Sequence, residues 1–171
     1  MNEPCTSHRA VPGGRKYRVL FLCTGNSCRS QMAEGWARNL HGAIVEPFSA
    51  GVVKSQLNEH AVQVMREVGV DISRQWSKTL EELPVQEFDL VFTLCDHAAE
   101  SCPRFPGNAR VIHVPFDDPP RLAAAERDPI AALNHYRRVR DEIQRFVASL
   151  NTYLPEPENP SSSKERADAT Q

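Results

Sequence analysis

Residues 22–30 read Leu22-Cys23-Thr24-Gly25-Asn26-Ser27-Cys28-Arg29-Ser30, between an apolar run and a helical pattern. A loop between a buried strand and a helix turns several main-chain N–H groups inward and points the helix N-terminus at the same place. Both features favour a tetrahedral anion. Gly25 permits a close approach that a side chain would hinder. The stretch therefore predicts an oxyanion-binding loop, made of Thr24, Gly25, Asn26, Ser27, Cys28 and Arg29.

Three side chains in this stretch suit nucleophilic chemistry on a bound anion. Cys23 lies at the mouth of the positive loop, which favours its thiolate form. Arg29 offers a planar fork of donors for two oxygens of the anion. The hydroxyl of Ser30 is placed to donate a hydrogen bond to the Cys23 sulfur, which stabilises the thiolate and later eases its departure. We therefore take Cys23, Arg29 and Ser30 as candidate catalytic residues.

On either side of the loop, apolar β-prone runs alternate with helical patterns. Strands are expected at Tyr17–Leu22, Val45–Ser49, Phe88–Leu94 and Arg110–Val114. A helix is expected at Ser30–Leu40, with Met32, Trp36 and Leu40 on one face. A second is expected at Glu59–Val68, with Ala61, Val62, Met65 and Val68 inward. The last helix is indicated by apolar residues at helical spacing, which are Leu133, Tyr136, Val139, Ile143, Phe146, Val147 and Leu150. This alternation predicts an α/β fold with a parallel sheet covered on both faces. Ligands in such folds lie at the carboxyl ends of the strands.

The composition of the 171-residue chain, 40% hydrophobic and 25% charged, is ordinary for one soluble domain. We expect a catalytic domain at residues 16–154, between a disordered N-terminal extension (1–15) and a disordered C-terminal tail (155–171). No membrane-length run or secretory signal is visible, so we expect a cytoplasmic protein, and a monomer. The formal net charge of −2 gives no basic field for nucleic acid, so an anionic substrate must be held by a local device.

The chain has five cysteines, which are Cys5, Cys23, Cys28, Cys95 and Cys102. In a reducing compartment, such a set indicates redox catalysis or metal binding rather than disulfide stapling. Cys95 and Cys102 follow the expected strand Phe88–Leu94, at the same end of the sheet as Cys23. Cys5 lies in the polar N-terminal segment, where we expect it to be incidental.

The sequence CTGNSCRS, followed by QMAEGW, resembles the signature of the low-molecular-weight protein tyrosine phosphatase superfamily, in its thioredoxin-linked arsenate reductase branch. The resemblance runs from about Tyr17 to Leu150. It implies a central four-stranded parallel sheet flanked by helices, and it implies no cofactor. It also implies that Cys23 is the nucleophile, Arg29 the oxyanion ligand and Ser30 the group that stabilises the thiolate.

The two branches share the loop, so other cysteines must decide between them. A phosphatase needs one cysteine and an acid, whereas an arsenate reductase must also dispose of two electrons. In the reductases that this sequence resembles, cysteines at the positions of Cys95 and Cys102 complete a relay. Cys23 would attack arsenic and water would leave. Cys95 would then attack the Cys23 sulfur and expel arsenite, and Cys102 would attack Cys95 to leave a Cys95–Cys102 disulfide. The resemblance thus implies arsenate as the substrate and thioredoxin as the reductant.

A separate acid should protonate the departing oxygen. Asp118, just before Pro119, matches the family's acid position and follows the last expected strand. Asp117 is the weaker candidate. Outside this context, an Asp-Asp-Pro stretch would be read as a plain turn.

A tyrosine phosphatase acting through a Cys23 phosphoenzyme is the alternative function. Such enzymes carry an aromatic pair after their Asp-Pro, and this chain has Pro120-Arg121 there. Because the oxyanion loop is common to both branches, residual hydrolysis of small aryl phosphates would be compatible with a reductase.

A structural zinc site made by Cys23, Cys28, Cys95 and Cys102 is an alternative of a different class. Four thiolates are the right number, but the intervals between the paired cysteines, four and six residues, are looser than the usual spacing. Arg29 has no use beside such a site, and we expect no metal. Cys28 is then expected to be structural.

Some reductases of this family bind a potassium ion beside the loop, through residues that correspond to Asn26, Glu34 and Ser49, plus an aspartate. Counting without gaps from Ser49, the place of that aspartate is taken here by Lys78. An ammonium group there would reach toward Glu34 and supply the charge that the ion otherwise provides. The alternative is that Lys78 is a surface lysine at the start of a helix.

Overall fold

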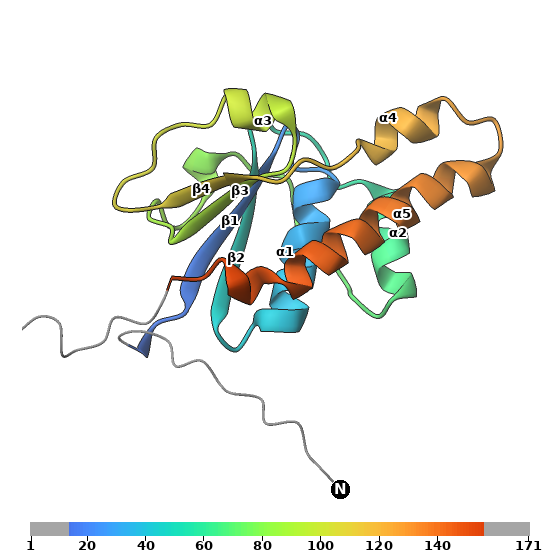
Figure 1. Ribbon diagram of the computed structural model, residues 1–171. Coiled ribbons are helices and arrows are strands. Elements are labelled where there is room, and N and C mark those ends of the chain that lie inside the picture. Colours follow the sequence, from blue (N-terminus) through green and yellow to red (C-terminus); the bar gives the residue numbers. More distant parts are fainter. Residues whose placement is uncertain (1–13, 156–171) are drawn as a thin grey trace, which may run out of the picture.

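A four-stranded parallel sheet with the strand order β2-β1-β3-β4 forms the centre of the molecule (Figure 1). The computed structural model describes residues 14–155. The strands are β1 (Tyr17–Cys23), β2 (Val45–Gly51), β3 (Leu90–Thr93) and β4 (Arg110–His113). This arrangement confirms the predicted fold class. The remainder of the two predicted tails, residues 1–13 with Cys5 and residues 156–171, lies outside the described part of the chain.

Helices α1 and α5 pack against each other beside the sheet, and α2 and α4 pack on α5 (Figure 1). The helices are α1 (Arg29–His41), α2 (Glu59–Glu67), α3 (Asp96–Glu100), α4 (Pro119–Ala124) and α5 (Pro129–Ala148), with 3₁₀ turns η2 (Leu80–Glu82) and η3 (Leu150–Thr152). The short helix α3 lies at the carboxyl ends of the strands. Within residues 14–155, no helix is both long and apolar enough to span a bilayer.

The core forms where the apolar runs of β1 and β3 meet α1 and α5. Every residue of β3 is buried, and β1 is buried except at Arg18. Gly35 in α1 allows the helix to approach the following segment closely, because a Cβ at this position would lie 2.5 Å from Cγ2 of Ile72. The strand and helix centres expected from the sequence are therefore correct, because long apolar stretches dominate them.

Several expected core positions are wrong. Leu40, in the last turn of α1, is 42% exposed, and Val68 is 40% exposed because it follows the end of α2 and no longer shares its inward face. Val62 is only half-buried, whereas Val64, which we did not expect inside, is fully buried. Helical periodicity alone does not show where a helix ends or which of its residues meet a packing partner.

The expected sheet also differs from the observed one at its edge. Strand β4 is mostly exposed, so the sheet is not covered evenly on both faces. Strand β3 is shorter than expected, because Phe88 and Leu94 lie outside the paired residues. The segment after Asp118 is the helix α4 rather than a plain turn, with Asp118 as its N-cap residue and proline at its start.

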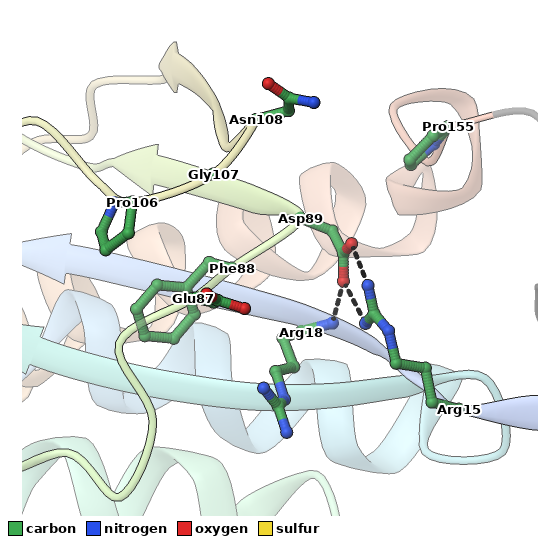
Figure 2. A pocket seen from close by; sticks show the side chains of 9 residues that line it. All are labelled: Arg15, Arg18, Glu87, Phe88, Asp89, Pro106, Gly107, Asn108 and Pro155. Carbon is green, nitrogen blue, oxygen red and sulfur yellow. Dashed lines mark hydrogen bonds and ion pairs between the residues drawn. The ribbon is translucent and has the colours of Figure 1, made fainter. Parts of the chain in front are cut away.

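At the amino ends of the strands, Arg15, which precedes β1, forms an ion pair with Asp89, which precedes β3. Its two terminal nitrogens each lie 2.8 Å from an oxygen of Asp89, and Asp89 also accepts the main-chain N–H of Arg18 at 2.7 Å (Figure 2). Burial alone would raise the pKa of Asp89, but the hydrogen bonds from Arg15 and Arg18 outweigh it and lower that pKa. The carboxylate is therefore the form that the folded state prefers.

Asp89→Asn should weaken the protein at neutral pH and not in acid. A carboxyl group with a lowered pKa stabilises the fold above its unfolded pKa, and this contribution is lost as the pH falls through the folded value. The pair is partly exposed, so we expect a loss of about 0.5–1 kcal/mol at neutral pH. Urea unfolding near pH 7 and near about pH 3 measures it. Glu46→Gln, which removes an exposed partner of Arg18, is the control and should change less. An equal loss at both pH values would contradict the pairing.

Candidate functional site

The loop between β1 and α1 presents unpaired main-chain donors at the carboxyl end of the sheet. Among the described residues, the N–H groups of Thr24 to Arg29 take part in none of the loop or turn backbone hydrogen bonds. Cys28 is the N-cap residue of α1 and gives no side-chain cap, so the helix N-terminus is also open. Asn26 has φ +45°, a left-handed conformation that non-glycine residues rarely adopt. These features together suit an anion, as the sequence predicts.

A chain of hydrogen bonds runs from Asn26 to the candidate nucleophile. Asn26 donates through Nδ2 to the Ser30 hydroxyl oxygen at 2.8 Å, and that oxygen lies 2.8 Å from the Cys23 sulfur. Because the oxygen already accepts a hydrogen bond from Asn26, its own proton is free to point at the sulfur. Cys23, Asn26 and Ser30 are all buried. The structure therefore brings together the sulfur and the hydroxyl that the sequence places seven residues apart.

Residues outside the loop hold Asn26 in its unusual conformation. Gln31 donates to the Asn26 carbonyl oxygen at 2.8 Å and to Oδ1 at 3.0 Å, and the main-chain N–H of Lys78 donates to the same Oδ1 at 2.9 Å. Ser77 donates to the carbonyl oxygen of Gly25 at 2.9 Å. The sequence analysis missed Gln31 and Ser77. Gln31 follows the loop directly in the sequence. By contrast, the residues around 77 and 78 form no local pattern that indicates contact with the loop.

Gly51, at the end of β2, is a further residue that the sequence analysis missed. A Cβ at this position would lie 2.6 Å from the carbonyl oxygen of Val53, 2.8 Å from the nitrogen of Asn26 and 2.9 Å from the carbonyl carbon of Gly25. Such distances are closer than a methyl group tolerates. The loop can pack on β2 because this residue has no side chain.

Arg29 points into the site with part of its guanidinium unsatisfied. Nη1 donates to the carbonyl oxygen of Phe116 at 3.1 Å, and Nη2 lies 3.4 Å from Oδ1 of Asp118. The Nε atom is buried and has no hydrogen-bond partner among residues 14–155. A buried donor without a partner is costly, and a bound oxyanion is one group that would satisfy it.

The two aspartates before Pro119 are separated by their partners. Asp118 lies beside Arg29, with its side chain 35% exposed. Asp117 turns away and pairs with Arg138 in α5 at 2.9 Å. The structure therefore places Asp118, and not Asp117, next to the group expected to bind the oxyanion.

Cys95 faces the same site from the neighbouring strand. Its sulfur lies 3.3 Å from the hydroxyl oxygen of Thr24, and it lines a cavity of about 410 Å³ together with Arg29, Asp96, Pro115, Phe116, Asp117, Asp118 and Arg121. Strands β1 and β3 are paired, with Leu22 opposite Thr93, so the residues that follow them emerge side by side. This pairing brings Cys95 to the loop although the two are distant in the sequence.

The other described cysteines differ in their surroundings. Cys102 lies beyond α3 and is half-buried, and burial raises the pKa of its thiol. Burial first, and the neighbouring Cys23 second, raise the pKa of the Cys28 thiol well above its usual range. Cys28 is therefore a neutral buried group, which agrees with a structural role. Cys23, Cys28, Cys95 and Cys102 all have free thiols.

Neither a metal cluster nor the cavity at the opposite edge of the sheet offers a competing site among the described residues. Within residues 14–155, no group of three or more His, Cys, Asp or Glu side chains could hold a metal ion, so the four cysteines of the zinc alternative do not gather. A cavity of about 450 Å³ at the amino ends of the strands includes Arg15 and Arg18 (Figure 2). Both arginines already pair with carboxylates, of Asp89 and Glu46 respectively, so they have no charge to spare for an anion.

The ammonium group of Lys78 lies beside the loop and is almost fully buried. Its Nζ atom is 3.5 Å from Oε2 of Glu34 and donates to the Ser49 hydroxyl at 3.4 Å and to the Trp76 carbonyl at 3.2 Å. Ser49 in turn donates to Glu34. The reading of Lys78 as a surface lysine is wrong, because the side chain is only 9% exposed.

Comparison with known proteins places these features in a family. A family model described as "Low molecular weight phosphotyrosine protein phosphatase" matches residues 18–159. The chain is 47% identical over 129 residues to an arsenate reductase of Halalkalibacterium halodurans, which covers 75% of this chain and 91% of the relative.

Solved structures show the same likeness. An arsenate reductase in its oxidised state superposes with a TM-score of 0.63 at 30% identity, covering 81% of this chain and 98% of the other. A low-molecular-weight protein tyrosine phosphatase of T. tengcongensis superposes with a TM-score of 0.63 at 29% identity, covering 81% of this chain and 100% of the other. The fold is thus shared by enzymes of both kinds.

Because Lys78 already supplies a buried cation, potassium should raise the melting temperature no more than sodium at equal ionic strength. Lys78→Asp should destabilise the protein by about 1–3 kcal/mol in sodium, since it places a second carboxylate beside Glu34 and leaves that residue with the partly exposed Arg38 as its partner. Potassium should then restore part of that loss. Thermal unfolding in the two salts measures both effects, and Lys54→Asp, at an exposed lysine paired with Glu82, is the matched control. A potassium-specific stabilisation of the unmodified protein would refute the idea.

Proposed function

This chain belongs to the low-molecular-weight phosphotyrosine protein phosphatase family, and from that premise we propose that it is an arsenate reductase with Cys23 as its nucleophile. The observation that carries the proposal is the second thiol in the site. Cys95 contacts the loop residue Thr24 and lines the same cavity as Arg29. A phosphatase has no use for such a thiol, whereas a reductase needs it to accept the oxidation.

In the proposed first step, arsenate binds to the open N–H groups of the loop and to Arg29, whose buried Nε has no hydrogen-bond partner within residues 14–155. The Cys23 thiolate, which accepts a hydrogen bond from Ser30, attacks arsenic. An oxygen leaves as water after Asp118 donates a proton to it, and a covalent bond joins the Cys23 sulfur to arsenic. Asp118 suits this task because it lies beside Arg29 and is open to solvent.

In the proposed second step, the Cys95 thiolate attacks the Cys23 sulfur. The sulfur–arsenic bond breaks, its electron pair stays on arsenic, and arsenic(V) becomes arsenic(III), which leaves as arsenite. The Thr24 hydroxyl, 3.3 Å from the Cys95 sulfur, is placed to donate a hydrogen bond to it and so to orient the attacking thiol. Cys102 then attacks the Cys95 sulfur and frees Cys23. The two electrons thus come from the thiols of Cys95 and Cys102, which end as a disulfide.

An external dithiol must reduce this disulfide, and thioredoxin is the reductant that we propose. The relay ends in a disulfide within one chain, which a dithiol reductant can open by exchange. Cys102 is half-buried rather than fully enclosed, which leaves a route for such an exchange. We propose that the domain works as a monomer in the reducing cytoplasm.

A phosphatase activity through a Cys23 phosphoenzyme is the second candidate, because the loop, Arg29 and Asp118 would serve a phosphate ester equally well. Two assays on the same preparation separate the candidates. One measures arsenate-dependent NADPH oxidation in the presence of thioredoxin and its reductase, and the other measures hydrolysis of an aryl phosphate. Arsenate turnover well above ester hydrolysis supports the reductase. Efficient ester hydrolysis with no arsenate turnover would overturn it.

Cys102→Ser should convert about one arsenate per enzyme molecule and then stop, since the second thiol exchange is missing. The stalled protein should contain a Cys23–Cys95 disulfide, which peptide mapping after alkylation detects. Cys23→Ser should convert none. Ser101→Ala, at the exposed neighbour of Cys102, is the matched control and should keep turning over. Sustained turnover by Cys102→Ser with thioredoxin would show that the relay order is wrong.

Oxidation should open α3. Cys95 precedes this helix and Cys102 follows it, so an intact helix would hold their Cα atoms about 10 Å apart, whereas a disulfide tolerates at most about 7 Å. The amides of Ala99 and Ser101, which donate to Cys95 and His97, should lose protection from hydrogen exchange on oxidation. Amides inside α1 serve as the control. Equal protection of α3 in both states would contradict the relay.

A further inference from the structure

His113, the last residue of β4, bridges two points on either side of Cys95. Its Nδ1 atom lies 2.9 Å from the hydroxyl oxygen of Thr93 and 3.2 Å from the carbonyl oxygen of the same residue. Its Nε2 atom lies 3.1 Å from Oδ1 of Asp96. Thr93 ends β3, and Asp96 begins α3. The imidazole therefore links the rigid sheet to the first turn of the helix.

Both ring nitrogens can be satisfied at once in this position. The carboxylate of Asp96 only accepts, so Nε2 carries a proton and donates to it. Nδ1 can accept from the Thr93 hydroxyl, and when protonated it can donate to the carbonyl oxygen instead. Hydrogen bonds at both nitrogens fix the orientation of the His113 ring, and the ring in turn orients the carboxylate of Asp96. Asp96 also lines the cavity that contains Cys95 and Arg29.

Helix α3 is short and makes few contacts with the rest of the described residues. The helix has five residues, and Ala98 is the one described as buried. Short helices gain little from their own hydrogen bonds and depend on contacts with their surroundings. The side chain of Asp96 is 86% exposed, and its hydrogen bond to His113 ties it to the sheet. Main-chain hydrogen bonds of Leu94 fix the residue before Cys95, so the bridge is the contact that holds the residue after it, Asp96.

We propose that His113 is a positioning residue for the segment Cys95–Cys102. It acts as a clamp, because its contact with Asp96 keeps Cys95 beside the loop while the thiols are reduced and is broken when α3 unwinds. The inference rests on the proposed function, because it takes Cys95 and Cys102 as the pair that is oxidised. The disulfide requires the first turn of α3 to open, and Asp96 is in that turn. The clamp thus stabilises the dithiol form and not the disulfide form.

This difference makes the redox equilibrium the natural measurement. When oxidised dithiothreitol converts the two thiols to the disulfide, it accepts their two electrons and two protons and becomes the dithiol. Removing the clamp should favour the disulfide. An exposed histidine–carboxylate pair is weak, so we expect a shift of about threefold in the exchange constant, which corresponds to about 14 mV toward a more negative potential.

The experiment equilibrates the full chain with dithiothreitol buffers, blocks free thiols by alkylation and digests with trypsin. Cys95 and Cys102 fall in one tryptic peptide, residues 79–104, without another cysteine, so its mass reports the fraction of disulfide. His113→Ala should give the shift, and His113→Gln, which keeps an N–H donor for Asp96, should recover most of it. His135→Ala is the matched control, because His135 forms a similar pair with Glu126 in a different part of the molecule and should cause no shift.

Asp96→Asn tests the same contact from the other side. It should also favour the disulfide, and the double variant with His113→Ala should shift no further than the larger single change, because both remove one interaction. If the two single changes in the exchange constant multiply in the double variant, the clamp is overturned. It is also overturned if His113→Ala leaves the exchange constant unchanged or if His135→Ala shifts it equally.

The assay contains no arsenate, so it separates this inference from the proposed function. If a Cys95–Cys102 disulfide forms and His113→Ala leaves it unshifted, the clamp alone is overturned. If no such disulfide forms in any buffer, the relay is overturned together with the clamp. If the shift appears but the enzyme reduces no arsenate, the clamp is upheld and the proposed activity fails.

Discussion

The left-handed conformation of Asn26 is the constraint on which the rest of the site depends. With φ +45°, this residue turns the main chain so that the loop keeps its N–H groups free and its side chain reaches Ser30. The conformation costs free energy, and the hydrogen bonds from Gln31 and Lys78 offset that cost. The proposed anion site and the orientation of the candidate nucleophile thus follow from one backbone angle held by its neighbours.

The parallel sheet brings the residues of the site together from distant parts of the sequence. Strands β1 and β3 are adjacent and run in the same direction, so the residues after both strands share one edge. The chain as a whole is slightly acidic, with a net charge of −2, and the positive character of the site is entirely local. It comes from a helix N-terminus, main-chain donors and the partly unsatisfied Arg29, which act over short distances and are little affected by the total charge.

The two halves of the site differ in how firmly they are held. The loop is fixed by buried hydrogen bonds and by contact with Gly51, so it is suited to bind an anion without rearrangement. The segment after β3 is a five-residue helix with one buried side chain and one bridging histidine. A thiol relay needs this contrast, because one sulfur must wait in a fixed position while another travels to meet it.

The sequence by itself determined the strand–loop–helix at Cys23–Ser30, the α/β class and the residues at the carboxyl edge, because these follow from local periodicity and from residue chemistry. It misjudged Leu40 and Val68, since local periodicity does not show where a helix ends or where its inward face loses its packing partner. The tertiary structure alone decided between a buried and a surface Lys78, and it alone brought Ser77, Gly51 and His113 against the site. Each of these contacts joins segments that are far apart in the sequence. The residues next to each one in the chain do not identify its partner, because only the folded sheet brings the two segments together.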